Sequence, residues 1–168
     1  MKTSRIALGA LVLSSAFLVA YVLWLGPALP PRVASHFSLG GRADGWSSRS
    51  RYDALYLGIA GLAEVLLVGL GFALPYLPAD SLHAPRQDYW RSPEHYPQAC
   101  AHVRNFLCWL GALTSLWFAA LHRLMANANR LNPPRLHDGA LGAVLVVYLG
   151  TVFLLVSRLI RRFERLPA

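Results

Sequence analysis

Glu64 is the only charged residue in a long apolar stretch, residues 54–79. About ten residues of helix, or roughly 15 Å, separate it from the start of that stretch, which would place it near the midplane of a membrane. A carboxylate at that depth is costly unless it is paired, protonated or hydrated, so Glu64 is a candidate for proton or cation movement. It also suits a structural role as a protonated acid in a hydrogen-bond network. The polar side chains expected at a similar depth are Ser14, Ser15, Thr114, Ser115, Tyr148 and Thr151.

The histidines and cysteines follow no familiar catalytic or metal-binding pattern. His95, Cys100 and His102 are close in sequence, but this spacing is not a zinc motif, and Cys100 would lie off the helical face that the histidines share. The sequence also lacks the Gly-x-Ser-x-Gly, His-Glu-x-x-His, P-loop and dinucleotide-binding motifs. We therefore expect no enzymatic activity, no bound metal and no cofactor. Four further side chains could approach one another across the bundle: His36, Asp44, His137 and Asp138. We expect them to form ordinary hydrogen bonds and not a metal site.

Residues 29–49, LPPRVASHFSLGGRADGWSSR, combine prolines, glycines and aromatic residues between two apolar stretches. Pro30 and Pro31 stop the preceding helix and keep the chain extended, whereas Gly40-Gly41 and Asp44-Gly45 favour tight turns. Trp46 would return the chain to the membrane interface. We expect an ordered loop, which serves either as a tight connection between two helices or as a binding surface.

The elements that must position these residues are membrane helices. Hydrophobic residues make up 55% of the 168 residues, charged residues only 14%, and the apolar residues form long blocks, which is typical of a membrane protein. The third block is short, and we expect its helix to continue through His122 to Met125 with these side chains at the interface. The predicted fold is an all-α integral membrane protein, a single four-helix bundle over residues 1–168, with spans at about 6–27, 54–77, 105–125 and 139–160.

The net charge of +8 would suggest nucleic acid binding in a soluble protein. Here the arginines flank apolar blocks, where basic residues meet lipid headgroups, so we expect a lipid bilayer and not a nucleic acid as the partner. Basic residues are more numerous on the side of the two termini, which predicts that both termini are cytoplasmic. The loop at 29–49 then faces outward, and the loop at 80–104 lies in the cytoplasm.

The loop at 80–104 contains a predicted helix start. Ser92-Pro93-Glu94 offers a serine cap, a proline at the first helical position and an acid in the first turn. Tyr89 and Trp90 suit an anchor at the membrane interface. We expect an amphipathic helix here that leads into the third span.

These two loops resemble a bacterial membrane protein family of unknown function, whose domain also forms the N-terminus of SdpI-type peptide-toxin immunity proteins. Ala34 and Ala43 stand where members commonly carry prolines, and His83 replaces a usual Asn, changes that would loosen the loop. The residues that carry the resemblance are Val33, His36, Phe37, Gly41, Asp44, Gly45, Trp46 and Ser48, then Asp88, Tyr89 and Trp90, and either Ala126-Asn127 or Ala128-Asn129.

The resemblance implies a multi-pass protein of the bacterial cytoplasmic (inner) membrane. In the best-known branch of the family it also implies protection against a secreted peptide and signalling to a repressor, but that branch usually has more spans. We interpret the chain as a non-enzymatic interaction, sensing or immunity-type protein that binds a protein or peptide partner through the loop at 29–49. The alternative is a small proton-coupled transporter or channel-like protein centred on Glu64. Glycines such as Gly58, Gly61 and Gly150 also suit contacts in a homo-oligomer.

Overall fold

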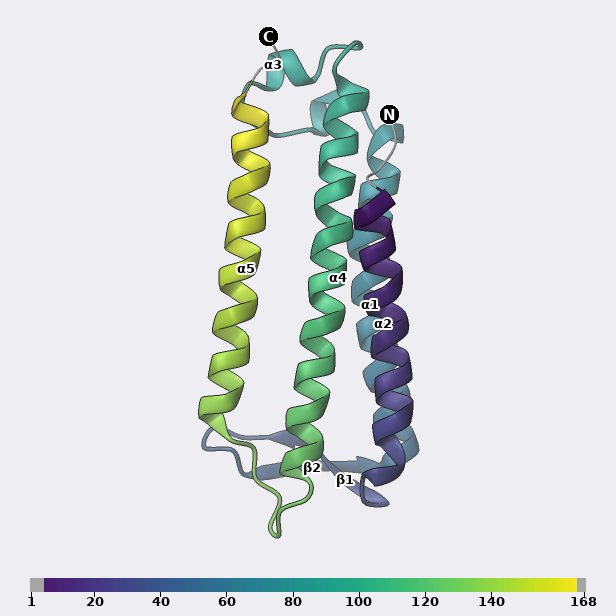
Figure 1. The fold of residues 1–168 in the computed structure, drawn as a ribbon, viewed down its shortest axis with the longest axis vertical. Helices are drawn as coiled ribbons and strands as arrows, with labels where there is room; N and C mark the ends of the chain where they lie inside the picture. The colour runs from purple at the N-terminus through teal and green to yellow at the C-terminus, as the bar shows by residue number, and fades with distance from the viewer. Residues whose placement is uncertain (1–4, 166–168) are drawn as a thin grey trace.

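Residues 5–165 are described by a computed structural model, in which four long helices run side by side (Figure 1). All four are long and apolar enough to cross a membrane, which confirms the predicted spans in number. The long helices are α1 (Arg5–Leu25), α2 (Arg49–Ala73), α4 (Tyr96–Ala128) and α5 (Asp138–Glu164). The short elements are η1 (Gly26–Ala28), β1 (Arg32–Phe37), β2 (Ala43–Ser48), η2 (Leu74–Tyr76), η3 (Ala79–Ser81) and α3 (Gln87–Trp90).

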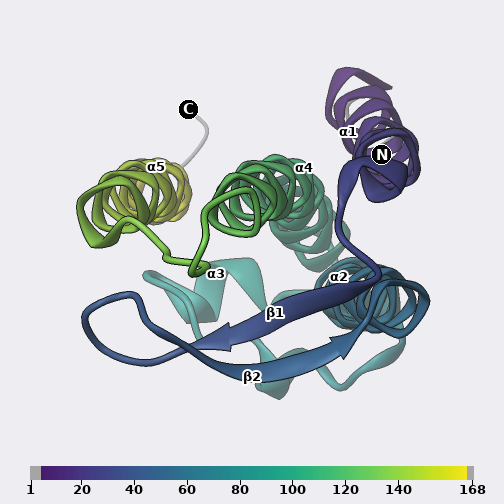
Figure 2. The ribbon, with the colours of Figure 1, turned by 90° about the horizontal axis from the view of Figure 1, so that it is seen from below.

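α4 is the central helix of the bundle and packs against α1, α2 and α5 (Figure 2). Its buried face is a stripe of small side chains, which includes Cys108, Ala112, Ser115 and Ala119. Small residues let helix backbones approach closely, and such packing drives helix association where lipid removes the hydrophobic effect. α1, α2 and α4 therefore form a tight three-helix unit, and α5 packs on the side of α4.

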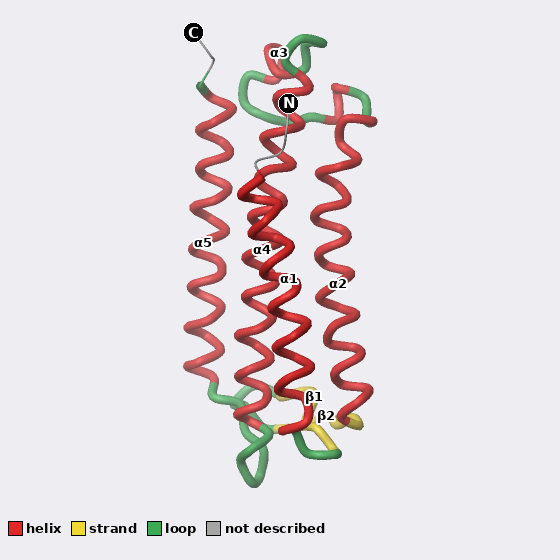
Figure 3. The backbone as a smooth tube through the Cα atoms, turned by 45° about the vertical axis from the view of Figure 1, so that its right-hand side comes forward, coloured by secondary structure: helices red, strands yellow, loops and turns green. Residues whose placement is uncertain are grey.

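The two ends of the bundle differ in content. α1 begins and α5 ends at the end that carries α3, which we call the α3 end (Figure 1). The strands β1 and β2 and the connection between α4 and α5 lie at the opposite end, which we call the hairpin end (Figure 3). The two loops that the sequence singles out are thus a full helix length apart.

The prediction of an all-α chain was wrong at the hairpin end. β1 and β2 pair antiparallel, with Arg32 opposite Ser48 and Phe37 opposite Ala43. The reason is that backbone N–H and C=O groups need partners wherever water is scarce, and an extended segment after two prolines obtains them by pairing with the returning chain. The expected ordered loop is therefore a β-hairpin.

The predicted helix before the third span is present, but it begins a few residues later than Ser92-Pro93-Glu94 indicated. α4 begins at Tyr96, with Pro97 in its first turn, and continues without a break into the stretch predicted as the third span. Ser92 does not cap it, because its hydroxyl donates to the carbonyl of Tyr89 at 2.9 Å and lies 2.8 Å from Nδ1 of His95. Residues 92–95 instead form a turn that leads into the helix.

Candidate functional site at the hairpin end

The hairpin turn depends on two glycines with left-handed backbones. Gly40 has a φ of 88° and Gly41 a φ of 73°, a region that side chains other than glycine rarely adopt. Gly41 also touches the connection between α4 and α5: a Cβ there would lie 2.0 Å from the carbonyl oxygen of Leu136. The amide of Leu136 donates to the Gly41 carbonyl at 2.8 Å. The tip of the hairpin is therefore fixed to the segment that precedes α5.

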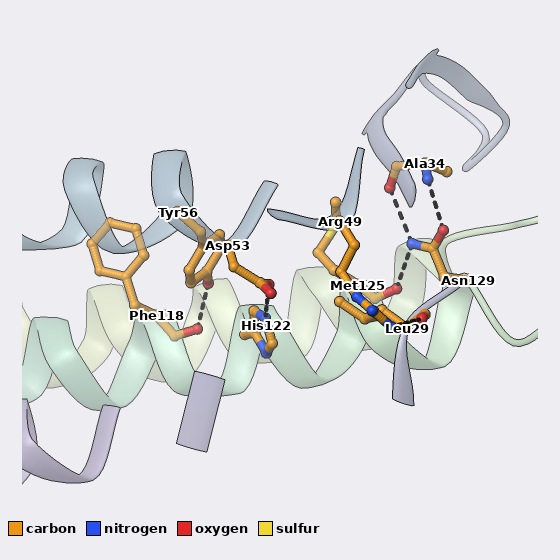
Figure 4. A network of polar contacts seen from close by, with 9 residues as sticks. All are labelled: Leu29, Ala34, Arg49, Asp53, Tyr56, Phe118, His122, Met125 and Asn129. Atoms are coloured by element: carbon orange, nitrogen blue, oxygen red, sulfur yellow. Dashed lines mark hydrogen bonds and ion pairs between the residues drawn. The ribbon is translucent and has the colours of Figure 1, made fainter. Parts of the chain in front are cut away.

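Asn129, directly after α4, holds the first strand of the hairpin (Figure 4). Its side-chain oxygen accepts from the Ala34 amide at 2.7 Å, and its side-chain nitrogen donates to the Ala34 carbonyl at 3.0 Å. Both residues are buried. Of the two Ala-Asn pairs in the sequence, Ala128-Asn129 is the one that contacts the hairpin, since Asn127 is exposed. A proline at position 34 could not donate this hydrogen bond, so the alanine tightens the loop here instead of loosening it.

His36 and Asp44 face each other across the two strands. Nδ1 of His36 lies 2.5 Å from a carboxylate oxygen of Asp44, and both side chains are exposed. Gly45 is opposite His36, and a Cβ there would come within 2.7 Å of the His36 Cβ. The Asp-Gly pair thus allows the strands to meet and supplies the acid that holds His36. His137 does not join this pair, because its ring accepts from the Ala140 amide at 3.2 Å and caps α5.

Trp46 lies at the centre of the outward face of the hairpin. It is 42% exposed, and the Arg32 guanidinium sits 5.1 Å from its ring centroid. One hollow of about 520 Å³ lies between Trp46, Arg32 and Arg51. A second, of about 270 Å³, lies between Trp46, Arg42 and Arg135. We call Trp46 with these four arginines the outer face of the hairpin.

His122 lies beneath the hairpin, inside the bundle, and not at the interface where the third apolar block predicted it. Its side chain is fully buried, and three tyrosine rings, Tyr21, Tyr52 and Tyr56, lie with centroids 5.0 to 6.4 Å from the imidazole. Neither ring nitrogen has a hydrogen-bond partner within residues 5–165. Its position was detectable in the sequence, because His122 continues the stripe of small residues on α4 at helical spacing.

Asp53 completes this buried cluster and was also missed, because it lies just outside the predicted second span. One carboxylate oxygen lies 3.8 Å from Nε2 of His122, too far for a hydrogen bond, and has no other partner within residues 5–165. The start of η1, directly after α1, closes over Asp53: a Cβ on Gly26 would lie 2.7 Å from the other carboxylate oxygen. Arg49, one turn earlier on α2, lies beside Leu29 (Figure 4) and donates to the Leu29 carbonyl at 3.2 Å. It also donates to the carbonyl of Pro27 at 3.2 Å.

Glu64 lies in the middle of the bundle and contacts α4. It accepts a hydrogen bond from Ser115, which is fully buried. The Ser115 hydroxyl also lies 3.5 Å from that of Ser15 on α1, so one polar line crosses three helices. On another side of α4, Thr114 and Tyr148 are 3.1 Å apart and link α4 to α5.

Asp88, Tyr89 and Trp90, of which the last two were expected to anchor the chain at the membrane interface, lie at the α3 end. Trp90 is 1% exposed, and its indole nitrogen donates to the carbonyl of Phe163 at 2.8 Å. Tyr89 stacks on His95 with centroids 3.8 Å apart, and Asp88 is exposed. Trp90 is therefore not an interfacial anchor, because it is buried against Ala99 of α4 and Phe163 at the end of α5.

Within residues 5–165 no group of three or more His, Cys, Asp or Glu side chains is arranged to hold a metal ion. Residues 13–55 match a family described as a domain of unknown function (DUF1648). The match runs from the middle of α1 through the whole hairpin to the first turns of α2. Comparisons with curated proteins and with solved structures give no match. The matched part of the chain is therefore centred on the hairpin.

Proposed function

We propose that this protein is a non-enzymatic, multi-pass membrane protein that binds a protein or peptide partner through the outer face of the hairpin. The observation that carries the proposal is Trp46, which is half-exposed between two hollows that each contain two arginines. Tryptophan and arginine are the residue types most enriched at binding hot spots. A partner with carboxylates next to an apolar or aromatic residue would complement this surface.

The support beneath the outer face strengthens this interpretation. Asn129 fixes the strand that carries Arg32, and Leu136 fixes the turn next to Arg42. Binding to a prearranged surface loses less entropy than binding to a mobile loop. A simple connection between two helices would need neither anchor.

We further propose that the hairpin faces outward and that the α3 end faces the cytoplasm of a bacterial inner membrane. The surplus of basic residues at the α3 end supports this orientation. A secreted peptide would then reach the outer face directly, as a sensing or immunity role in the manner of SdpI-type proteins requires.

Capture from a peptide mixture tests the proposal. The full chain would be placed in phosphatidylcholine nanodiscs, exposed to peptides secreted by bacteria, washed and analysed by mass spectrometry. We expect a recurrent acidic peptide that Trp46→Ala loses and that Trp24→Ala retains. Trp24 is the matched control, since it is exposed at the same end of the bundle but outside the hairpin. Equal retention by both variants, or no recurrent peptide, would contradict the proposal.

A second candidate function, a proton-coupled transporter or channel-like protein, stays an alternative because of the polar line through Glu64, Ser115 and Ser15. It predicts pH-driven flux in liposomes that Glu64→Gln abolishes, while Gln keeps an acceptor for Ser115. Thr151→Ala is the control, since Thr151 donates only within its own helix, to Val147. Absence of flux in the wild type at every pH would exclude this alternative.

A further inference from the structure

Two hollows lie in line between α4 and α5. The larger, of about 580 Å³, is near the α3 end, and the smaller, of about 310 Å³, is further along the helices. On α4 the lining residues recur every three or four positions, which places them on one helical face. They include His102, Asn105, Trp109, Leu113, Leu116 and Ala120. The two hollows lie one after the other between the same two helices, and we call them together the α4–α5 groove.

The end of the groove near α3 combines apolar side chains, such as Phe106 and Leu155, with polar and positively charged ones. Arg158 and Arg162 line it from successive turns of α5, and Arg162 donates to His102 at 3.4 Å. Within residues 5–165 neither arginine forms an ion pair with a carboxylate. The side-chain oxygen of Asn105 is buried and has no hydrogen-bond partner among these residues. This end therefore has unneutralised positive charge and a free acceptor, which together suit an anion that also carries hydroxyl groups.

The other end of the groove is apolar. Leu116, Val144 and Val147 line it, and Trp117 stacks on Tyr148 at a centroid distance of 4.9 Å. None of the eighteen residues in the most apolar window of α5 is buried within the protein. About ten residues of α4 separate the centres of the two hollows, or roughly 15 Å, which is half the thickness of a bilayer core and therefore the length of one acyl chain.

We propose that the α4–α5 groove binds one anionic phospholipid. Its phosphate contacts Arg158 and Arg162, a headgroup hydroxyl donates to Asn105, and one acyl chain lies along the groove towards Trp117. Basic pockets between membrane helices are known to bind anionic headgroups. A helix from a second copy or another protein would fit the apolar end, but it would need its own acid to neutralise the two arginines.

Lipid retention by the purified full chain tests this site. Native mass spectrometry in detergent would compare phosphatidylglycerol with phosphatidylcholine of the same acyl chains. We expect one retained phosphatidylglycerol, preferred by about tenfold, and a loss of about tenfold in the double variant Arg158→Gln/Arg162→Gln. The matched control, Arg161→Gln/Arg165→Gln, removes the same charge from the same helix end and should retain the lipid. Equal losses in both double variants, or equal retention of the two lipids, would overturn the proposal.

Two further arms separate the lipid from other occupants. Ala143→Phe narrows the apolar hollow without touching the arginines, and we expect it to weaken lipid retention by about tenfold. Excess inorganic phosphate should not displace the lipid, because it lacks the acyl chain. Displacement by phosphate, full retention in Ala143→Phe, or a lipid-free dimer joined through α5 would each overturn the assignment. Thermal unfolding in lipid-free detergent would confirm that every variant is folded.

Discussion

α1 and α5 both run along α4, but the protein holds them in different ways. α1 buries a residue on nearly every turn, from Ala7 through Leu18 to Val22, and Leu11 lies against Gly111 of α4. Among the residues of α5, Asp138–Glu164, only Phe163 is buried, near the end of the helix. The bundle therefore has a tight side, made by α1, α2 and α4, and a loose side, made by α4 and α5.

α5 is attached at its two ends and at one point between them. Phe163 is held by Trp90 at the α3 end, and Leu136 is held by Gly41 at the hairpin end. Between them, Tyr148 contacts Thr114. In lipid, apolar helices gain little by association alone, so a helix with few buried residues depends on such local contacts. The tight side can support the rigid hairpin, and the loose side leaves room for the α4–α5 groove.

Among the variants that test the difference between the tight and loose sides, Trp90→Ala should cause the largest loss of stability. It removes a buried indole and its hydrogen bond to Phe163, and we expect a loss of about 3–5 kcal/mol of stability. Thermal unfolding in detergent measures the change, and cysteine cross-linking between α4 and α5 would report detachment of α5. Trp24→Ala is the control, with little effect expected because Trp24 is 71% exposed. Equal effects of the two variants would show that Trp90 does not hold α5.

The second test compares two neighbouring glycines. Gly41→Ala adds a Cβ that collides with the Leu136 carbonyl in a left-handed backbone, and we expect a loss of about 2–3 kcal/mol. Gly40→Ala has the same backbone strain but open space around it, so it should cost only about 1 kcal/mol. Unfolding midpoints of the pair give the difference. Equal losses would mean that the hairpin tip is not tied to the segment before α5.

The third test concerns the anchor of the first strand. Asn129→Ala leaves the buried N–H and C=O of Ala34 without partners, and we expect a loss of about 2 kcal/mol. Hydrogen exchange should become faster at the Ala34 amide. Asn127→Ala is the matched control, because that side chain is exposed. Unchanged exchange in the Asn129 variant would contradict the role of this residue.

The smallest effect should follow from His122→Phe. Within residues 5–165 both imidazole nitrogens are buried without partners, so an apolar ring of similar size should leave stability unchanged or raise it by up to about 1 kcal/mol. Leu121→Ala, on the same turn, is a packing control that should destabilise the protein. A clear loss of stability in His122→Phe would instead show that His122 and Asp53 form an ion pair that holds the tight side together.

The sequence was sufficient for the membrane helices because blocks of about twenty apolar residues are rare outside membrane spans. It also predicted the turn at Gly40-Gly41, since turn chemistry is local, but the second turn that it predicted, at Asp44-Gly45, lies within β2. Strand pairing was not predicted, because it depends on residues that meet across the turn and on Asn129, which is far away in the chain. Trp90 was misplaced for the same reason: an interfacial tryptophan and a buried one have the same local sequence, and only the contact with Phe163 distinguishes them.

Site-specific photo-crosslinking tests the central claim, partner binding at the outer face, most directly. A crosslinker at Ser48, which lines the hollow beside Trp46 and Arg32, would be activated in native membranes, with His83 at the opposite end as the control position. We predict a recurrent protein or peptide adduct at Ser48 that is absent at His83 and lost with Trp46→Ala. Efficient labelling at Ser48 that yields only lipid adducts would contradict the claim and identify the hairpin as a structural connection.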